Sequence, residues 1–462
     1  MKSIPYFLVL SAGKGTRFKS SIPKVLHPIL GKPMLEVLIE KILKLQPKKV
    51  YIIVGYKKEM IIERFSDPQI KYIIQDEQLG TAHAIMCCED EIEFKDEDGI
   101  IINGDIPLIK ISSLLEFYKY HLKNKNSLTL MSAILESPNE YGRIVRGSSG
   151  EIKKIVEAKD LTEEENKIKE INAGIYCFSY NKIFPYLKKI SNVNKKKEYY
   201  LTDIIDILIK KGEKVGVWMN KNSDEILGIN DREELSRATD ILRLEKIREL
   251  QKNGTTIIDP NTSWIEWDVS IGKDSIVYPY TFIEGNTKIG RNSKIYSFTH
   301  ISNSIIGDSV TVLTSSYIQN SNLKNGSTVG PFCRIRMNSQ IEKGARVGNF
   351  VEVKNTKFGE GSKAMHLTYL GDSEIGKNVN IGAGTITCNF DGKKKNKTII
   401  ESDVFIGSGT ELVAPVKIGK KSYVGAGSTI TKNVPPFALA IAREKQKNKL
   451  NWVKKKIMKC AE

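Results

Sequence analysis

The sequence predicts an α/β domain with a parallel sheet in the first half of the chain and a parallel β-helix in the second half. Two observations lead to this prediction. Strand patterns alternate with helical patterns in the first half, and an aliphatic residue followed by glycine recurs after Gly254. Alternating strands and helices form a parallel sheet with helices on both faces, whereas a six-residue repeat is typical of a parallel β-helix.

The first half of the chain contains short apolar runs separated by amphipathic segments. Ligands of such sheets bind beyond the carboxyl ends of the strands, and the strings "LSAGKGTR" and "INGDIP" lie at such ends. A long charged helix is expected at 230–254, closing on Gly254. The predicted strands are 5–13, 49–56, 71–75 and 99–107, and the predicted helices before the long one are 34–45 and 81–92.

The second half repeats a pair made of a small aliphatic residue and glycine. Ile271-Gly272 and Ile289-Gly290 stand 18 residues apart, as do Val329-Gly330 and Val347-Gly348, and steps of 6 and 12 occur further on. In a β-helix each such aliphatic residue points inward and stacks on its counterpart one coil away. With three hexapeptides per coil, we expect roughly ten coils and a prism about 48 Å long, given ~4.8 Å between strands.

Composition limits the class of protein. The chain has 462 residues, enough for two or three domains. Its 71 Lys and Arg exceed its 54 Asp and Glu, and the net charge is +17. This charge favours anionic partners such as nucleotides, phosphosugars, nucleic acid or acidic lipid, although a lysine-rich proteome would explain it equally well.

The cysteine spacing and the N-terminal segment indicate the cellular compartment of the protein. No CxxC pair is present, so neither a zinc ribbon nor a disulfide framework is predicted, and free thiols fit a reducing cytoplasm. The N-terminal apolar run is too short for a membrane span and lacks a small-residue cleavage site. We therefore expect a cytosolic protein. The cysteines are Cys87, Cys88, Cys177, Cys333, Cys388 and Cys460.

The loop after the first strand has the composition of a phosphate-binding loop. A dinucleotide fingerprint requires a third glycine after Gly13 and Gly15, and an ATP-type loop requires Gly-Lys-Ser/Thr; neither is present. What remains is a glycine turn whose amides can face a phosphate, with Arg17 and Lys24 as nearby cations. A plain glycine-rich turn is the alternative, which the two cations make less favourable.

Several longer strings then identify a family. "LSAGKGTR", "PKVLH", "QLGTAHA", "NGDIP", "YGRIVR", "VEAKD", "NAGIY" and "GIN" resemble, in order, nucleotidyltransferases that join a sugar phosphate to a nucleoside triphosphate. "GNFVEVKN", "KAMHLTYLGD", "NIGAGTITCNFDG" and "KTIIESDVFIGS" are similar to the bifunctional N-acetylglucosamine-1-phosphate uridylyltransferase / glucosamine-1-phosphate acetyltransferase family of bacteria. The resemblance spans about residues 5–443. It implies a Rossmann-like N-terminal domain, a left-handed parallel β-helix and a homotrimer.

For the first domain, the resemblance implies uridylyl transfer from UTP to N-acetylglucosamine 1-phosphate. Both reactants are anions, so the site must neutralise charge and align them. Asp105 and Asn230 match the Mg²⁺ ligands, and Arg17 and Lys24 match catalytic cations that brace the phosphates. Other matching residues are Leu10, Ser11, Ala12 and Gly13 at the uridine and phosphate end, Gln75, Gly80 and Thr81 at the uracil and ribose, Asn103 and Gly104 beside Asp105, and Gly142, Glu157 and Asn172 at the sugar.

For the second domain, the resemblance implies acetyl transfer from acetyl-CoA to glucosamine 1-phosphate. His366 matches the general base, since an imidazole with its ordinary pKa near ~6.5 can take the proton of the amine at neutral pH. Direct attack of the amine on the thioester needs no protein nucleophile. The matching acceptor-site residues are Arg336, Lys354, Tyr369, Asn380 and Lys395, and the matching acetyl-CoA residues are Ala383, Asn389, Phe390, Ser408, Ala426 and Arg443.

The sequence departs from the family pattern at a few of these positions. Met337-Asn338 replaces a usual Pro-Gly after Arg336, and Met365 replaces a usual glycine beside the base. Phe390 replaces a tyrosine, and Asn103 replaces a bulkier, often aromatic residue. We expect loss of the Phe390 hydroxyl to have little effect, whereas Met365 is the substitution most able to alter the acetyl-transfer rate.

The basic segment from Arg443 to Lys459 has two interpretations. Nucleic-acid binding would need a stacking platform, and Trp452 alone does not supply one. We therefore favour an arm that reaches the CoA site of a neighbouring subunit, with neither nucleic acid nor membrane as a partner. The expected divisions of the chain are a uridylyltransferase domain at 1–229, a helical linker at 230–253, an acetyltransferase β-helix at 254–442 and a basic tail at 443–462.

Two other functions remain to be distinguished from the bifunctional enzyme. One is a nucleotidyltransferase for another sugar whose β-helix only trimerises or regulates; the strings "HLTY" and "NIGAGTITCNFDG" disfavour it, because a purely structural coil needs no His, Lys or Asn on its outer face. The other is a non-enzymatic scaffold. The presence of Arg17, Lys24, Asp105 and Asn230 disfavours the scaffold.

Overall fold

The computed structural model describes residues 4–194 and 197–459, so Cys460 lies outside the described residues. The chain forms two compact units, 1–242 and 243–462. The division falls inside the long helix α7 (Arg232–Lys252), which lies in the segment expected as a linker. The domain borders themselves stay a prediction. No helix within the described ranges is long and apolar enough to cross a membrane.

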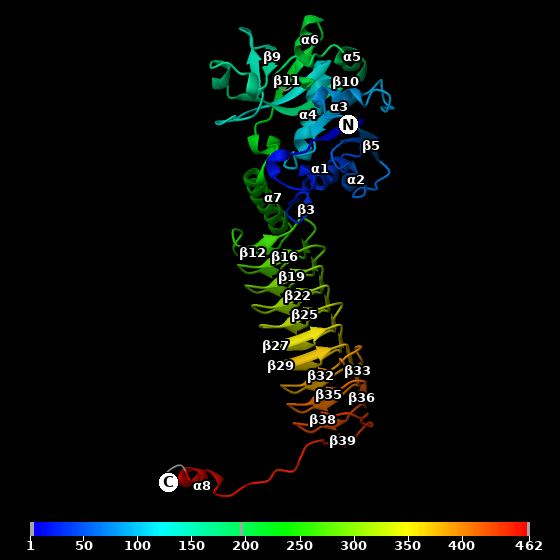
Figure 1. The fold of residues 1–462 in the computed structure, drawn as a ribbon, viewed down its shortest axis with the longest axis vertical. Helices are drawn as coiled ribbons and strands as arrows, with labels where there is room; N and C mark the ends of the chain where they lie inside the picture. Colours follow the sequence, from blue (N-terminus) through cyan, green and yellow to red (C-terminus); the bar gives the residue numbers. More distant parts are fainter. Residues whose placement is uncertain (1–3, 195–196, 460–462) are drawn as a thin grey trace. The chain divides into compact units, whose positions relative to one another are not determined.

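The first unit is built around a mixed sheet with strand order β11-β7-β10-β6-β1-β4-β5. Helices lie around this sheet (Figure 1). The strands are β1 (Tyr6–Ser11), β4 (Lys49–Val54), β5 (Ile70–Ile74), β6 (Asp98–Asn103), β7 (Leu128–Ile134), β10 (Glu170–Ser179) and β11 (Val215–Met219), with β8 (Arg143–Arg146) and β9 (Ile152–Val156) attached to β10 and a small hairpin of β2 (Pro28–Ile29) and β3 (Lys32–Pro33).

The sheet is Rossmann-like but not wholly parallel. β1 pairs in parallel with β4 and β6, as expected, whereas β10 runs antiparallel to both β6 and β7. The alternating strand and helix pattern that predicts a parallel sheet covers only the first half of this unit. It therefore does not predict the direction of β10. The helices are α1 (Met34–Leu43), α2 (Lys58–Ile62), α3 (Thr81–Met86), α4 (Ile111–Asn124), α5 (Tyr180–Leu187) and α6 (Ile204–Lys210); α3 is shorter than the predicted 81–92.

The central strand β1 explains where the first site lies. Its residues Tyr6 to Val9 are fully buried, as expected for a parallel strand covered on both faces. Leu10 of β1 is paired with Asn103 of β6. The loops after these neighbouring strands therefore open side by side at the carboxyl edge of the sheet.

The second unit is a left-handed parallel β-helix, and Figure 1 shows its short strands stacked coil upon coil. Its aliphatic residues stack as the repeat predicts: Ile271 pairs with Ile289, Ile289 with Ile306, and Ile306 with Leu323. These side chains are buried in one continuous core. The residue before each of them on the strand points outward, as in Lys288 beside buried Ile289.

The glycines after these aliphatic residues are required by the close stacking of coils. A Cβ added to Gly272 would lie 2.7 Å from the carbonyl carbon of Gly290, closer than any side chain can pack. Buried hydroxyls join successive coils as well. Ser275 Oγ donates to the Gly290 carbonyl at 2.8 Å, and Ser293 Oγ donates to the Gly307 carbonyl at 2.9 Å. Such bonds satisfy backbone groups inside the prism.

The strands of the β-helix lie on the faces of a prism. The first face holds β12 (Thr256–Ile257), β15 (Ile276–Val277), β18 (Lys294–Ile295), β21 (Thr311–Val312), β24 (Thr328–Val329), β31 (Asn380–Ile381), β34 (Phe405–Ile406), β37 (Tyr423–Val424) and β39 (Leu439–Ala440). The second holds β13 (Trp264–Ile265), β16 (Phe282–Glu284), β19 (His300–Ser302), β22 (Tyr317–Gln319), β25 (Arg334–Arg336), β32 (Ile386–Cys388), β35 (Glu411–Val413) and β38 (Thr429–Ile430). The third holds β14 (Ser270–Ile271), β17 (Lys288–Ile289), β20 (Ile305–Ile306), β23 (Asn322–Leu323), β26 (Gln340–Ile341), β28 (Lys357–Phe358), β30 (Ser373–Ile375), β33 (Thr398–Ile400) and β36 (Val416–Ile418).

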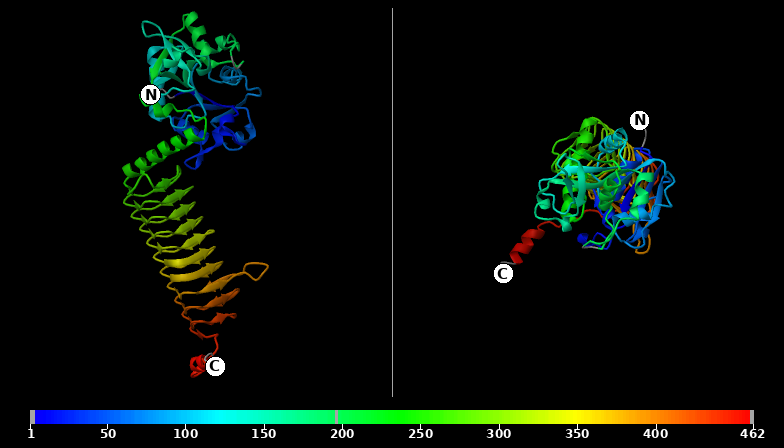
Figure 2. Two further views of the ribbon diagram at one scale, coloured as in Figure 1. Left: turned by 60° about the vertical axis from the view of Figure 1, so that its left-hand side comes forward. Right: turned by 90° about the horizontal axis from the view of Figure 1, so that it is seen from above.

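Two irregularities position the second site. The long strands β27 (Arg346–Lys354) and β29 (Lys363–Gly371) turn the corner from the first face to the second, and they pair with each other along both. One coil is enlarged, because Ile375 pairs directly with Ile400. Its extra residues form a loop at 389–397 that projects from the β-helix (Figure 2). The chain ends in an exposed segment that carries α8 (Trp452–Lys459).

Candidate functional sites

A cavity of about 330 Å³ opens at the carboxyl ends of β1 and β6. All four residues expected at the uridine and phosphate end line it, at the end of β1 and in the loop that follows. The lining residues that the sequence predicted are Leu10, Ser11, Ala12, Gly13, Lys24, Gln75, Gly80, Thr81, Asn103 and Asp105. Gly104 lies between the last two and donates its N–H to the Leu10 carbonyl at 2.9 Å.

The predicted metal ligands come together from distant parts of the chain. Lys24 Nζ donates to both Asp105 Oδ2 and Asn230 Oδ1, the latter at 3.2 Å. The other carboxylate oxygen, Asp105 Oδ1, is buried and has no hydrogen-bond partner among the described residues. Asn230 is fixed in turn by its N–H, which donates to Glu234 Oε2 at 2.6 Å. The Asp105 carboxylate and the Asn230 amide oxygen are thus brought together by the Lys24 ammonium, which bonds both.

The residues expected at the uracil and ribose form one side of the cavity. Gln75 is buried, and its Nε2 donates to the Gly80 carbonyl at 3.1 Å. Thr81 begins α3, and its Oγ1 accepts the Leu201 N–H at 3.0 Å. Gly80 has φ +116°, a backbone conformation that favours glycine. The turn between β5 and α3 is therefore held rigidly against the cavity.

The residues expected at the sugar also cluster: Asn172 lies on β10, Gly142 directly before β8 and Glu157 directly after β9. The Asn172 N–H donates to the Gly142 carbonyl at 2.9 Å. A Cβ on Gly142 would lie 3.7 Å from Glu157 Oε2, and Glu157 Oε1 accepts a hydrogen bond from Thr202 Oγ1 at 2.9 Å. Asn103, which replaces a bulkier residue, lies against Gly174.

Arg17 is the predicted cation that does not line this cavity. Its guanidinium pairs instead with the exposed carboxylate of Glu140, on the loop before β8. The structure also adds lining residues that sequence reasoning missed. One of them, Gly15, belongs to the glycine turn that the sequence shows. Its φ is +61°, and a Cβ there would lie 2.5 Å from Lys24 Cβ, so only glycine lets Lys24 approach the loop. The missed lining residues are Gly15, Val25, Gln78, Ala84 and Glu198.

In the β-helix, the predicted base and most predicted acetyl-CoA residues share one corner. Ala364, Ile381, Ile406 and Val424 are paired in successive coils. His366, Ala383, Ser408 and Ala426 each lie two residues further on, so they form a column parallel to the prism axis. At ~4.8 Å per coil the column is about 14 Å long. Arg443 reaches its far end, where Nη1 donates to the Ala426 carbonyl at 2.8 Å.

The imidazole of His366 is exposed and held in one orientation. His366 pairs with Asn349 on the neighbouring strand, and its Nδ1 lies 2.8 Å from Asn349 Oδ1. Because an amide oxygen can only accept, Nδ1 carries the proton and Nε2 keeps its lone pair. Sequence reasoning missed Asn349, although its string "GNFVEVKN" was one of those that identified the family.

The predicted acceptor residues lie mainly at the far end of the second face. Arg336 pairs with Lys354 across β25 and β27, and its guanidinium contacts Glu352 Oε1 at 2.7 Å. Lys354 is buried, with Nζ 3.7 Å from Asp372 Oδ2. Asn389 Nδ2 lies 3.4 Å from Tyr369 Oη.

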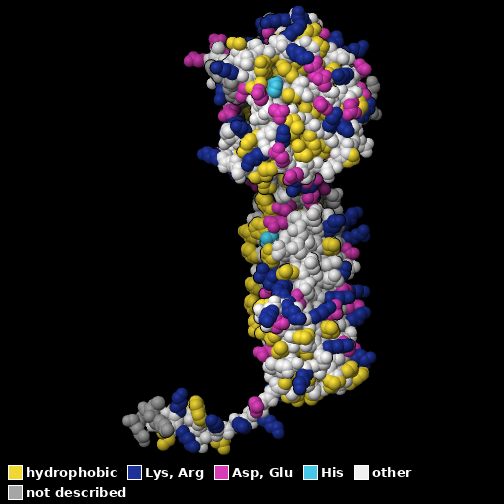
Figure 3. Space-filling view, turned by 45° about the vertical axis from the view of Figure 1, so that its right-hand side comes forward, with side chains coloured by type: hydrophobic (Ala, Val, Ile, Leu, Met, Phe, Trp, Pro, Cys, Tyr) yellow, Lys and Arg dark blue, Asp and Glu magenta, His cyan; other side chains and the backbone are white. Residues whose placement is uncertain are grey.

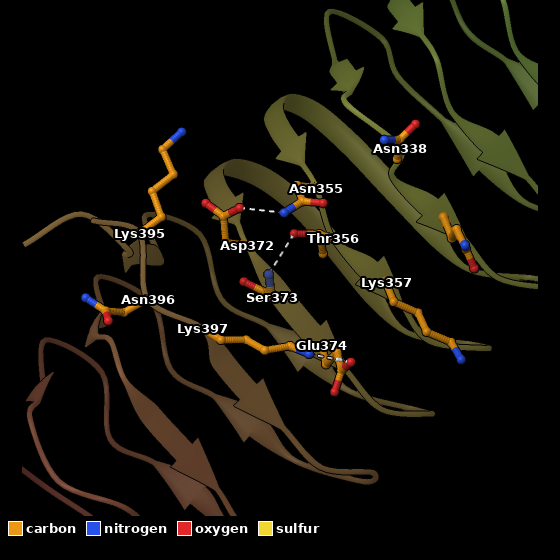
Figure 4. A pocket seen from close by; sticks show the side chains of 11 residues that line it. Asn338, Asn355, Thr356, Lys357, Asp372, Ser373, Glu374, Lys395, Asn396 and Lys397 are labelled. Carbon is orange, nitrogen blue, oxygen red and sulfur yellow. Dashed lines mark hydrogen bonds and ion pairs between the residues drawn. The ribbon is translucent and has the colours of Figure 1, made fainter. Parts of the chain in front are cut away.

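The loop 389–397 brings a second cation to this corner. The pKa of Lys395 is lowered, mainly by the ammonium of Lys354 beside it. Phe390 is exposed and bridges to Lys395, so Phe390 and Asn389 do not lie on the His366 column within this chain. A cavity of about 500 Å³ adjoins the corner, lined by Asp372 and Lys395 among others (Figure 4).

Three predicted or divergent residues lie between or beside these groups. Asn380 begins β31 on the first face, paired with Lys363 of β29. Met365 is exposed next to His366, and a Cβ on Gly348 would clash with its backbone, so glycine is needed in the coil above. Met337 is also exposed, and its sulfur lies 3.3 Å from Arg336 Nη1.

Comparisons with known proteins cover both units. Residues 6–264 match the nucleotidyl transferase family, and residues 397–432 match the bacterial transferase hexapeptide family of six repeats. Among solved structures, UDP-glucose pyrophosphorylase complexed with UDP-glucose covers 52% of this chain and 99% of its own length, with 21% identity and a TM-score of 0.45.

Full-length relatives carry the name "Bifunctional protein GlmU". The relative from Caldicellulosiruptor saccharolyticus is 46% identical over 97% of this chain and 96% of its own. Those from Acetivibrio thermocellus and Shouchella clausii are 45% and 43% identical, each over 98% of this chain and over 97% and 99% of their own. The matched lengths take in both compact units. The chain belongs to the bifunctional GlmU family of transferases.

Proposed function

We propose that the chain makes UDP-N-acetylglucosamine in two steps. Its β-helix acetylates glucosamine 1-phosphate with acetyl-CoA, and its N-terminal unit then joins the product to UMP from UTP and releases pyrophosphate. The observation that carries the proposal is that each compact unit holds one set of family residues: the uridylyl-transfer set lies in and around one cavity, and the acetyl-transfer set lies at two corners of the β-helix. Both reactions are assigned to the cytoplasm, in keeping with the free thiols of the described chain.

In uridylyl transfer, an oxygen of the sugar phosphate attacks the α-phosphorus of UTP and pyrophosphate leaves. Asp105 and Asn230 would hold Mg²⁺, and the buried, unpartnered Asp105 Oδ1 fits a hard cation. No cluster of three or more His, Cys, Asp or Glu that could hold a metal occurs among the residues described, which suits an ion that completes its shell with substrate phosphates. Bound there, Mg²⁺ supplies charge neutralisation.

The chain's own groups would do the rest. The amides after β1 and the Lys24 ammonium face the triphosphate, Gln75 and the Gly80 turn hold the base, and the cluster around Asn172 holds the sugar. Arg17 differs from Lys24, because its guanidinium pairs with Glu140 outside the cavity. This ion pair must open before the guanidinium can reach a phosphate.

Lys24 should compete with the metal in the nucleotide-free protein. Its ammonium bonds both predicted metal ligands, so the Lys24→Met variant is expected to bind Mn²⁺ about 10-fold more tightly without nucleotide, since a competing charge-assisted contact is lost. Electron paramagnetic resonance of free Mn²⁺ measures this affinity directly. Lys57→Met, which removes another lysine of this unit that bonds a backbone carbonyl, is the control. Unchanged or weaker Mn²⁺ binding would contradict the competition.

In acetyl transfer, the amine of glucosamine 1-phosphate attacks the thioester carbon and coenzyme A leaves as its thiol. His366 Nε2 would take the amine proton, while the Nδ1–H bond to Asn349 keeps the ring in place. The small residues of the His366 column leave room for the pantetheine arm along the corner. Arg336, Lys354 and Lys395 would bind the sugar phosphate.

The acceptor cations and the His366 column lie at opposite ends of the second face, which supports a site completed by a neighbouring chain. We therefore propose a homotrimer through the β-helix. At the corner between the first and second faces, large apolar side chains have left-handed backbone conformations, which cost roughly 1–2 kcal/mol each. Their exposed fractions are 51% for Tyr280, 63% for Phe298, 52% for Phe332, 58% for Phe350 and 64% for Leu367.

We call these five residues the apolar corner. Figure 3 shows hydrophobic side chains gathered along one edge of the β-helix. Tyr280 stacks on Phe298 at 5.3 Å and Phe332 on Phe350 at 5.5 Å between ring centroids. An exposed stacked column of this kind marks a protein–protein contact, and a second copy of the chain is the partner that would complete the acetyl-transfer site.

The apolar corner gives a direct test of assembly. The double variant Phe298→Asn/Phe350→Asn keeps the left-handed turns, which asparagine tolerates, but removes two aromatic anchors. We expect the variant to be a monomer, because truncating such anchors weakens association by over ~1 kcal/mol each. Its acetyl transfer should fall at least about 10-fold, and its uridylyl transfer should be unchanged. Light scattering and the two assays measure this. Ile305→Thr, an exposed change on the third face, should remain trimeric; a trimeric double variant would argue against this surface.

The two half-reactions are assayed separately. Pyrophosphate release from UTP and N-acetylglucosamine 1-phosphate reports the first site, and thiol release from acetyl-CoA and glucosamine 1-phosphate reports the second. Absence of thiol release would leave only a single-activity nucleotidyltransferase.

A further inference from the structure

The corner after β29 carries a carboxylate where earlier coils carry amides. Asp372 has φ 49°, and Asn303, Asn320 and Asn355 have left-handed conformations at the same corner in earlier coils, with φ of 45°, 45° and 47°. Asparagine and aspartate both tolerate this backbone. The turn therefore does not require a charge at residue 372, and the change to aspartate occurs in the coil where Lys354 and Lys395 meet.

The carboxylate of Asp372 contacts three side chains from two segments, the end of β27 and the 389–397 loop. Oδ1 accepts from Asn355 Nδ2 at 2.6 Å, and Oδ2 accepts from Asn389 Nδ2 at 2.5 Å. Lys354 Nζ lies 3.7 Å from Oδ2. Figure 4 shows Asp372 facing Asn355, with Lys395 nearby on the neighbouring segment. Asp372 thus ties the base of the 389–397 loop to the preceding coil.

Asp372 is held in its ionised form. Burial raises the pKa of Asp372. The hydrogen bond from Asn355, the charge of Lys354 and the hydrogen bond from Asn389 together lower the pKa by more, so it lies below the ordinary aspartate value. The ionised carboxylate offers an acceptor oxygen to each of the two amides. An asparagine at this position would present one acceptor oxygen and one donor amide NH2 to two donors, so one of the two bonds would be lost.

The contacts of Asp372 also affect Lys395, the second lysine of this corner. Lys395 lies on the loop that Asp372 fixes through Asn389, and its pKa is lowered chiefly by the nearby ammonium of Lys354. Two ammonium groups repel each other, so the loop holds them together against their mutual repulsion. A phosphate dianion placed between them would relieve that repulsion.

We propose that Asp372 is a positioning residue for the sugar phosphate: it docks the 389–397 loop so that Lys395 stands beside Lys354 as a two-lysine clamp. This inference rests on the proposed acetyl transfer to glucosamine 1-phosphate. Asp372 itself does not touch the phosphate. Its role differs from that of a simple counter-charge, which predicts the opposite effect: removing a negative charge beside two lysines would tighten phosphate binding.

The Asp372→Asn variant separates these two roles. We expect a KM for glucosamine 1-phosphate about 10- to 100-fold higher, the effect of losing one charge-assisted hydrogen bond, with the KM for acetyl-CoA and the melting temperature unchanged. Asp403→Asn is the matched control. Asp403 also has a left-handed backbone, φ 60°, and accepts from Asn378 Nδ2 at 3.3 Å, but at another corner. A KM that falls or stays constant in Asp372→Asn overturns the proposal.

A double-variant cycle tests whether Asp372 acts through Lys395. Lys395→Met alone should raise the KM, and adding Asp372→Asn to it should raise the KM less than twofold further, because the lysine that Asp372 positions is already gone. Fully additive effects would contradict the mechanism. Calorimetric titration of the trimer with inorganic phosphate gives the same comparison without turnover. If the wild type acetylates nothing yet binds phosphate more tightly than Asp372→Asn, the proposed function fails while the clamp stands.

Discussion

Replacing Asp105 by alanine is expected to lower uridylyl transfer by on the order of 10³-fold, the upper range for loss of one preorganised electrostatic group. The substitution removes the carboxylate whose Oδ1 is buried and unpartnered and whose Oδ2 bonds Lys24 among the described residues. Of the two proposed metal ligands, Asp105 and Asn230, the metal would lose the charged one. Acetyl transfer should be unchanged, because the β-helix is a separate compact unit.

Pyrophosphate release and CoA thiol release, measured on the same preparation, check this expectation. Asp206→Ala serves as the control, since Asp206 is an exposed carboxylate in an i,i+4 pair with Lys210, and such pairs contribute little. Loss of both activities in a folded, trimeric Asp105→Ala protein would refute the division of the two reactions between the units.

Replacing His366 by alanine is expected to lower acetyl transfer by about 10²- to 10⁴-fold, the range for loss of a general base. The other described residues of the column and its neighbour carry no imidazole: Asn349 is an amide, and Ala383, Ser408 and Ala426 follow in the column. Uridylyl transfer should continue at the wild-type rate. Steady-state thiol release with both substrates saturating measures the change in kcat.

His300→Ala is the matched control for this variant. His300 also lies on the outer surface of the β-helix, but its Nε2 is 2.6 Å from Glu284 Oε2, and it lies outside the His366 column. Equal loss of acetyl transfer in the two variants would mean that His366 acts through stability or assembly instead of through its lone pair.

The fold followed from local patterns wherever those patterns were dense. The Ile-Gly repeat predicted the coil because close stacking leaves no space for a Cβ at positions such as Gly272. The antiparallel course of β10 could not be predicted in this way, since strand direction depends on which edge a distant segment reaches. The loop at 389–397 was not predicted, because the repeat places the stacked aliphatic residues and not the insertions between them.

The candidate sites show the same limit. Asp105 and Asn230, far apart in the sequence, were paired by family resemblance, and the structure joins them through Lys24. Arg17, predicted with Lys24, pairs with Glu140 of the loop before β8, a partner that the sequence pattern does not indicate. Asn349 and Asp372 were missed because each acts on a neighbour from another coil, a relation that appears only when the coils are stacked.

One polypeptide is proposed to carry two independent transfer sites that work in sequence. Incubation of the purified full-length protein with glucosamine 1-phosphate, acetyl-CoA, UTP and Mg²⁺, with each component omitted in turn, tests it most directly by mass spectrometry of the products. We predict UDP-N-acetylglucosamine only in the complete mixture, and N-acetylglucosamine 1-phosphate with free CoA when UTP or Mg²⁺ is left out. A nucleotide sugar formed without acetyl-CoA consumption, or no acetylated sugar in any mixture, would contradict the claim.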